Sequence, residues 1–128
     1  MSNSSHKYPR VLLVEDMPFL RYAFGRLLRL HGFDVCEAND GREALDCLAH
    51  FHPELVLTDL VMPVMNGFDL IRALRSDPKT ADVPVVAFTA DPTEQTEREA
   101  RQAGVAEYFT KPVDLASFMN RLRTLGVA

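Results

Sequence analysis

Several short apolar runs, separated by stretches with helical spacing, constrain the fold of this chain more than any other feature. The runs lie within residues 10–16, 54–59, 83–90 and 105–112. Short continuous apolar runs are typical of strands that are covered on both faces. A further segment, residues 33–37, alternates between apolar and polar residues and predicts an edge strand. Strands that alternate with helices indicate βαβ units and a single parallel sheet.

The intervening segments predict helices with defined ends. Pro18 suits a first helical turn, and Gly32 ends a stripe formed by Leu20, Phe24, Leu27 and Leu28. Three arginines fall outside that stripe, namely Arg21, Arg26 and Arg29. Asn66 is expected to cap the third helix and Asp114 the last one. The fourth helix, residues 91–103, has only a thin apolar face, which predicts low local stability.

Length and composition indicate one globular domain. The chain has 128 residues, of which 47% are hydrophobic and 25% charged, enough to form a core. We expect a disordered tail over residues 1–8 and a domain over residues 9–128, with no linker and no room for a second domain. The net charge of -4 argues against direct nucleic-acid binding, and the sequence predicts no membrane segment. Cys36 and Cys47 are interpreted as reduced residues of a cytoplasmic protein.

Carboxylates follow two of the predicted strands. Glu15 and Asp16 end the first apolar run, and Asp59 ends the third strand. If these strands are adjacent and parallel, the three acids converge at one edge of the sheet, where open α/β sheets bind ligands. Their mutual repulsion would raise their pKa values unless a cation lay among them. An all-oxygen cluster without Cys or His favours Mg²⁺ over zinc.

A hydroxyl and a lysine stand at the ends of the last two predicted strands. Thr89 follows one apolar run and Lys111 follows the other. Phosphoryl transfer needs a metal, a fixed cation and hydrogen-bond donors around the phosphoryl oxygens. An aspartate such as Asp59 can accept a phosphoryl group covalently. Taken together, these residues predict a site that phosphorylates Asp59.

The order and spacing of these motifs resemble the receiver domain of two-component response regulators. The resemblance runs from about Pro9 to the C-terminus. It rests on five elements: Glu15-Asp16, Asp59, Met62-Pro63-x-Met65-Asn66-Gly67, Thr89-Ala90 and Tyr108-x-x-Lys111-Pro112. It implies an α/β fold, a (βα)5 doubly wound, flavodoxin-like sheet with strand order 2-1-3-4-5.

The resemblance also implies how the site works. Asp59 would take a phosphoryl group from a histidine kinase, a histidine phosphotransfer protein or a small phosphodonor. Mg²⁺ would be bound by Asp16, Asp59 and the backbone carbonyl of Val61, with Glu15 reaching the metal through water. Lys111 would contact the phosphoryl group.

The same resemblance implies how the site would signal. Thr89 and Tyr108 would form the conformational switch, and the peptide bond between Lys111 and Pro112 is expected to be cis. The switch would alter a face made by residues 91–103, the last strand and the last helix, where a downstream protein or a second copy of the chain would bind. The implied function is phosphorelay signalling in the cytoplasm. The chain would catalyse only its own phosphorylation and dephosphorylation.

Three alternatives remain at this point. A haloacid-dehalogenase-like phosphatase would place an acid two residues after Asp59, where this chain has Val61. A pseudo-receiver would be expected to lack one of the acidic pair, the acceptor or the lysine, and all are present. A receiver fragment of a larger hybrid kinase or transcription factor is compatible with the sequence.

Overall fold

The computed structural model describes residues 9–62, 64–90 and 93–124, which form five strands alternating with five helices. In chain order the elements are β1 (Arg10–Val14), α1 (Pro18–Leu30), β2 (Asp34–Ala38), α2 (Gly41–Cys47), β3 (Leu55–Asp59), α3 (Gly67–Ser76), β4 (Val85–Thr89), α4 (Glu94–Gln102), β5 (Glu107–Thr110) and α5 (Leu115–Thr124). The predicted alternation of strands and helices is confirmed.

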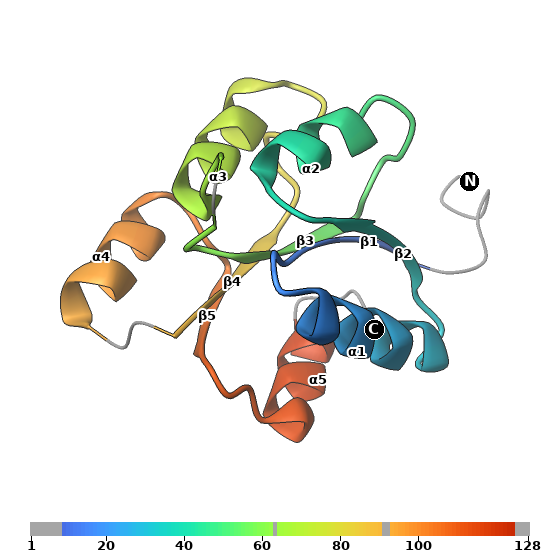
Figure 1. Ribbon diagram of the computed structural model, residues 1–128. Coiled ribbons are helices and arrows are strands. Elements are labelled where there is room, and N and C mark those ends of the chain that lie inside the picture. Colours follow the sequence, from blue (N-terminus) through green and yellow to red (C-terminus); the bar gives the residue numbers. More distant parts are fainter. Residues whose placement is uncertain (1–8, 63, 91–92, 125–128) are drawn as a thin grey trace.

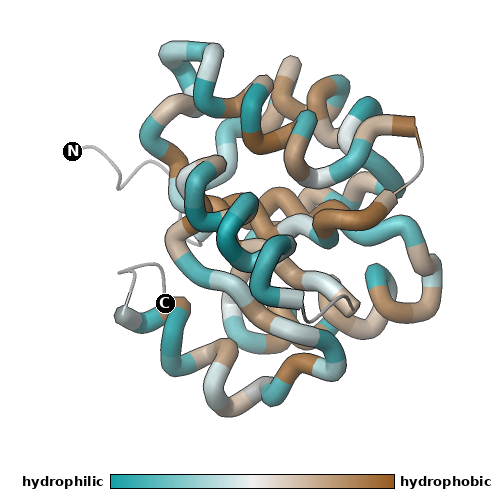
Figure 2. Tube along the Cα trace, turned by 90° about the vertical axis from the view of Figure 1, so that its left-hand side faces the viewer, coloured by the Kyte–Doolittle hydropathy of each residue, from teal (hydrophilic) through white to brown (hydrophobic). Residues whose placement is uncertain are grey.

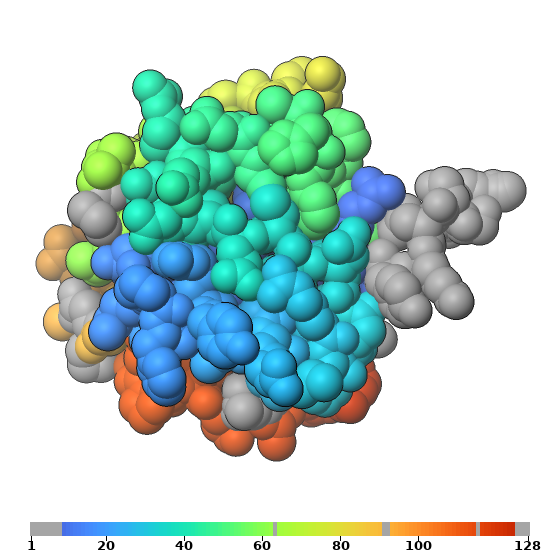
Figure 3. Space-filling model, turned by 45° about the vertical axis from the view of Figure 1, so that its right-hand side comes forward, coloured from blue at the N-terminus to red at the C-terminus, as the bar shows by residue number. Residues whose placement is uncertain are grey.

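The five strands form one parallel sheet in the order β2-β1-β3-β4-β5. This confirms the predicted flavodoxin-like (βα)5 fold and the edge position of β2. In Figure 1 the sheet separates α1 and α5 on one side from α2 and α3 on the other, with α4 beside β4 and β5. Figure 3 shows α1, in blue, below the teal segment of β2 and α2 and above α5, in orange.

Each face of the sheet has its own apolar core. One core packs strand residues such as Val85 and Ala87 against α2, α3 and Ala100 of α4. The other packs Val86 and Phe88 against α1 and α5. Successive side chains of a strand point to opposite faces, so neighbouring residues of β4 belong to different cores. The second core includes four aromatic rings in contact, those of Phe24, Phe88, Phe109 and Phe118.

The helix ends follow local side-chain chemistry. The Asn66 side chain accepts a hydrogen bond from the amide of Asp69 and caps α3, as predicted. Asp40 caps α2 in the same way by accepting from Glu43. Within α4, Ala100 is the one fully buried residue, which agrees with its thin apolar face. Figure 2 shows α4 at the front of the molecule, coloured teal over most of its length.

The interpretation of both cysteines as reduced is wrong in this structure. Cys36 of β2 and Cys47 of α2 are joined by a disulfide. Helix α2 packs against β2 and β1, and this brings its last residue beside the middle of β2. Cysteine usage indicates only the usual redox state of a class of proteins and carries no information on this proximity.

Some predictions concern segments outside the described residues. These are the tail over residues 1–8 and the first residues of the helix predicted from position 91. Of the helices in the described ranges, none has the length and apolar character that a membrane crossing requires.

Candidate functional site

Four strands bring the predicted site residues to the carboxyl edge of the sheet. Asp59 and Thr89 are the last residues of β3 and β4, while Glu15 and Lys111 directly follow β1 and β5. Glu15, Asp16 and Asp59 each place one carboxylate oxygen within 4.8 Å of the others. The parallel register makes this meeting possible, because all the carboxyl ends lie on one side.

Lys111 supplies the cation that the clustered acids require. Its Nζ lies 2.7 Å from Oδ2 of Asp59 and 2.8 Å from Oε1 of Glu15. Burial by itself would lower the pKa of Lys111, but the hydrogen bonds to Asp59 and Glu15 outweigh that effect and raise it. Lys111 is therefore fully charged at neutral pH. The Lys111–Pro112 peptide bond is cis, as predicted.

Glu15 is the most deeply enclosed acid of the group, with only 3% of its surface exposed. Burial raises its pKa, and the negative charge of Asp59 raises it further. The hydrogen bonds from Lys111 and from the amide of Met17, the latter 3.2 Å long, oppose this rise without cancelling it. Protonation of Glu15 therefore becomes easier in the folded protein than in the unfolded chain.

Asp59 is held by its own loop. One carboxylate oxygen accepts a hydrogen bond of 3.1 Å from the amide of Val61, and the Thr58 hydroxyl donates to the main-chain carbonyl of Asp59. Gly67 begins α3 directly against this segment. A Cβ atom on Gly67 would meet the carbonyl oxygen of Asp59 and would lie 2.8 Å from Cα of Leu60. Glycine is thus required for the close approach of α3 to the end of β3.

A cavity of about 480 Å³ opens onto these residues. Its lining combines polar site residues with apolar ones, namely Asp16, Met17, Leu20, Asp59, Val61, Ala90 and Lys111. Asp16 is half-buried, whereas Val61 is 66% exposed at the rim. The cavity therefore lies between Asp59 and the exposed rim at Val61.

The donor set fits a hard divalent cation. Three carboxylates offer oxygen ligands, and partial solvent access leaves room for the water ligands that Mg²⁺ retains. No His or Cys belongs to this cluster in the described part of the chain, which disfavours zinc.

Thr89 and Tyr108 lie on the same face of the sheet. Thr89 is completely buried and shares its face with Ala87, two residues earlier in β4. Tyr108 pairs with Ala87 in the β4–β5 register and packs, half-buried, against the core on that face. The main-chain carbonyl of Thr89 also accepts a 2.7 Å hydrogen bond from the amide of Lys111.

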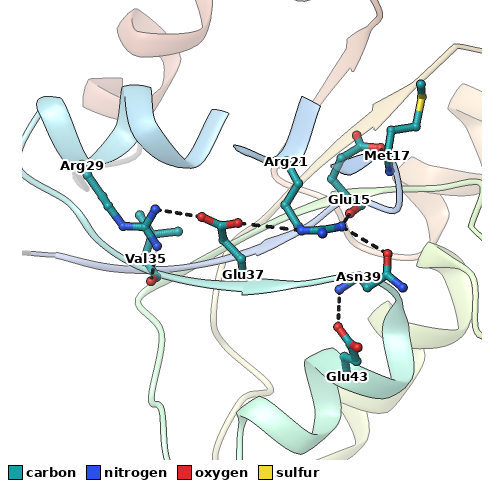
Figure 4. A network of polar contacts seen from close by, with 8 residues as sticks. All are labelled: Glu15, Met17, Arg21, Arg29, Val35, Glu37, Asn39 and Glu43. Carbon is teal, nitrogen blue, oxygen red and sulfur yellow. Dashed lines mark hydrogen bonds and ion pairs between the residues drawn. The ribbon is translucent and has the colours of Figure 1, made fainter. Parts of the chain in front are cut away.

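The structure adds one residue, Arg21, that the sequence pattern does not assign to the site. The pattern places Arg21 outside the apolar stripe, whereas its guanidinium donates to the main-chain carbonyl of Glu15 (Figure 4). A usable signal existed, because side chains in the first turns of a helix point back toward its N-terminus. A long cation three residues after Pro18 could therefore have been expected to reach the preceding loop.

Comparisons with known proteins agree with this geometry. The profile of the family described as response regulator receiver domain matches residues 11–123. The transcriptional regulator RpaA of Synechocystis is 33% identical over 91% of this chain, but the match spans only 48% of RpaA. Protein PilH of Pseudomonas aeruginosa is 32% identical, with 91% of this chain and 96% of PilH covered.

A solved structure with a similar fold is the receiver domain of sensor histidine kinase PA1611 from Pseudomonas aeruginosa. It superposes with a TM-score of 0.83 and 28% identity, covering 92% of this chain and 97% of the other. That structure has a magnesium ion coordinated in its active site cleft.

Proposed function

The chain belongs to the response regulator receiver domain family, and from this we propose that it accepts a phosphoryl group on Asp59 as one step of a phosphorelay. Receiver domains are signalling domains rather than enzymes with separate substrates, so the reaction would be the chain's own phosphorylation and dephosphorylation. One observation carries the proposal: Asp59 lies 2.7 Å from Lys111 and within 4.8 Å of two further carboxylates, beside an open cavity.

The proposed step is a nucleophilic substitution at phosphorus. A carboxylate oxygen of Asp59 forms the new P–O bond while the P–N bond of a donor phosphohistidine breaks, and the imidazole leaves with its electron pair and takes up a proton. Lys111 and the hydroxyl of Thr89 would donate hydrogen bonds to the phosphoryl oxygens. Asp59 is suited to attack because its pairing with Lys111 keeps it oriented toward the cavity.

We propose Asp16, Asp59 and the main-chain carbonyl of Val61 as direct ligands of Mg²⁺, with Glu15 acting through water. When bound, the ion neutralises negative charge on the transferring group. The magnesium ion in the cleft of the PA1611 receiver domain supports this assignment, as does the oxygen-only donor set here. The Glu15 carboxylate already accepts hydrogen bonds from Lys111 and from the Met17 amide, which suits contact with the ion through a water molecule.

We propose that Thr89 and Tyr108 pass the modification to the face formed by α4, β5 and α5. New phosphoryl oxygens on Asp59 would draw the Thr89 hydroxyl toward them, and Tyr108 would occupy the space behind it. Support comes from their shared face of the sheet and from the thin packing of α4. Elements of low local stability are suited to switching.

The proposed partners are a sensor histidine kinase or a histidine phosphotransfer protein upstream, and a downstream protein or a second copy of the chain at that face. A dimer could pair Glu107 with Arg121 or Arg123 of the second copy. Within one chain, Glu107 and Arg121 already lie 3.7 Å apart. This ion pair is already made internally, which favours a different protein as the downstream partner.

The wider context is also a proposal. The 48% coverage of RpaA is compatible with a receiver fragment of a larger protein, while the coverage of PilH is compatible with a stand-alone receiver.

A cytoplasmic location is proposed because histidine kinases draw on ATP. A Cys36–Cys47 disulfide would be unusual in that reducing compartment. Alkylation of thiols in intact cells, followed by mass measurement, tests the location and the disulfide together.

Intact-mass measurement tests the proposed acceptor. Wild-type protein is incubated with acetyl phosphate or phosphoramidate, with Mg²⁺ or with EDTA, and one added phosphoryl group is expected only with Mg²⁺. Asp59→Asn should show none, whereas Asp34→Asn, a change at an exposed acid of β2, should label like wild type. Equal labelling of Asp59→Asn would exclude Asp59 as the acceptor, and labelling that EDTA does not reduce would contradict a Mg²⁺-dependent reaction. Wild-type protein that is not labelled at all would favour a pseudo-receiver.

Hydrogen exchange with and without beryllofluoride tests the output face. Changes are expected between residues 89 and 110. A response confined to α1 or α2 would contradict the proposed switch.

A further inference from the structure

Arg21 of α1 connects the acidic loop, which carries Glu15 and Asp16, to the edge strand β2 (Figure 4). Its Nη1 donates a 2.7 Å hydrogen bond to the main-chain carbonyl of Glu15 and a 3.1 Å hydrogen bond to Oδ1 of Asn39. Its Nε lies 3.7 Å from Oε1 of Glu37 on β2. The Arg21 side chain is only 21% exposed, so these contacts are made in a largely enclosed position.

The partners of Arg21 are themselves held in place. The other carboxylate oxygen of Glu37 lies 2.7 Å from Nη1 of Arg29, about two turns further along α1. The main-chain amide of Asn39 donates a 2.6 Å hydrogen bond to Oε1 of Glu43 on α2. Gly25 makes room for this arrangement, because a Cβ atom there would collide with the Glu37 carboxylate.

The contact with Glu15 acts on the peptide unit that leads directly into Asp16. Glu15 and Asp16 lie after the end of β1 and before the start of α1, so neither regular element fixes both sides of this peptide. The orientation of that peptide determines where the Asp16 side chain points. A planar guanidinium with several donors can hold the carbonyl, Asn39 and Glu37 at once, which an ammonium group cannot do in the same geometry.

We propose that Arg21 is a positioning residue for the Mg²⁺ site, fixing the Glu15–Asp16 peptide by a hydrogen bond that Glu37 and Asn39 orient. This inference rests on the proposed function, since it concerns the same site. It assigns Arg21 no contact with the metal or the phosphoryl group. The positive charge of Arg21 is not the source of the effect, because a cation beside the acids would weaken binding of a divalent cation.

The test compares Arg21→Gln, Arg21→Lys and a matched control, Arg29→Gln. Arg29 shares the Glu37 partner but contacts the Val35 carbonyl instead of the acidic loop. Mg²⁺ affinity is measured by calorimetry on the full chain, unfolding by urea reports stability, and amide NMR shifts of Glu15 and Asp16 report loop geometry without metal. Both Arg21 variants should bind Mg²⁺ about tenfold more weakly than wild type, because the loss of a residue that hydrogen-bonds a metal-binding segment typically weakens metal affinity by that amount.

The control separates positioning from general stability. Arg29→Gln should lose stability but bind Mg²⁺ within about twofold of wild type, because it leaves the contact to Glu15 in place. The amide shifts of Glu15 and Asp16 should move in the Arg21 variants only. At saturating Mg²⁺ the rate of labelling by acetyl phosphate should recover, since the defect lies in assembling the site.

Two results would overturn the inference. Arg21→Lys with wild-type Mg²⁺ affinity would show that charge alone suffices, and Arg21→Gln with equal or tighter binding would show that charge only repels the ion. If Arg21→Gln does not fold, Arg21→Lys decides by the same criterion. Wild-type protein that binds no Mg²⁺ would overturn the proposed function itself, and that result is obtained before any variant is compared.

Discussion

Replacing Lys111 with methionine should destabilise the metal-free protein, and the size of the loss follows from the site geometry. Lys111 lies 2.7 and 2.8 Å from two acids that are 6% and 3% exposed. Removing one partner of a buried ion pair costs about 3 to 5 kcal/mol. The Lys111 side chain is itself 20% exposed, so we expect the lower end, about 3 kcal/mol at pH 7.

The loss should depend on pH in a defined direction. The pKa of Glu15 is raised above its ordinary value of 4.5 by burial and by Asp59, and the loss of Lys111 removes the main opposing effect. A group with a raised pKa in the folded state favours folding at low pH, and this contribution disappears as pH rises through the folded-state pKa. Lys111→Met should therefore regain stability between pH 7 and pH 5.

The assay is urea unfolding followed by circular dichroism in EDTA at pH 5 and pH 7. Lys79→Met, a change at an exposed lysine, serves as the matched control and should stay within about 0.5 kcal/mol of wild type. Added Mg²⁺ should stabilise Lys111→Met more than wild type, because it replaces the missing cation. A loss below about 0.5 kcal/mol at pH 7, or an equal loss at both pH values, would refute the electrostatic reasoning.

Three further predictions concern neighbouring features. The pKa of Lys111 is raised above 10.5, so wild-type protein should lose stability as pH rises through the folded-state pKa. Lys111→Met should lack this loss at alkaline pH. Identical stability profiles of the two proteins at alkaline pH would contradict this prediction. Gly67→Ala should lower the unfolding free energy by about 2 kcal/mol and weaken Mg²⁺ binding, because the new Cβ meets the backbone of Asp59 and Leu60. Gly25→Ala is its control for stability alone, since that Cβ meets only side-chain atoms, and an equal loss of stability in both variants would count against the reasoning. Val64→Gly should raise stability by about 1 kcal/mol in the same urea assay, because Val64 has a φ of 66° and is 85% exposed; unchanged or reduced stability would show that this backbone angle carries no penalty.

The fold and the clustering of the site were predictable because both follow from strand periodicity. Apolar runs with helices between them allow few arrangements, and residues at the ends of parallel strands must share an edge. The meeting of Asp59 with Glu15 and Lys111 is a direct result of that register.

Other features depend on packing between elements, which a linear pattern does not encode. The contact of Arg21 with the Glu15 carbonyl requires the orientation of α1 on β2, and the Cys36–Cys47 disulfide requires the position of α2. The raised pKa of Glu15 depends on its degree of burial. The sequence contains all of these residues but gives no distances between them.

The separation of the two cores by the sheet has a consequence for how such a chain can evolve. Val85 and Ala87 belong to the core shared with α4, while Val86 and Phe88 belong to the core of α1 and α5. Substitutions that reshape one core therefore leave the packing of the other largely intact. Related proteins could therefore change the residues near α4 and gain new downstream partners while the aromatic cluster under α1 changes independently. The two sides of the domain need not diverge in sequence at equal rates.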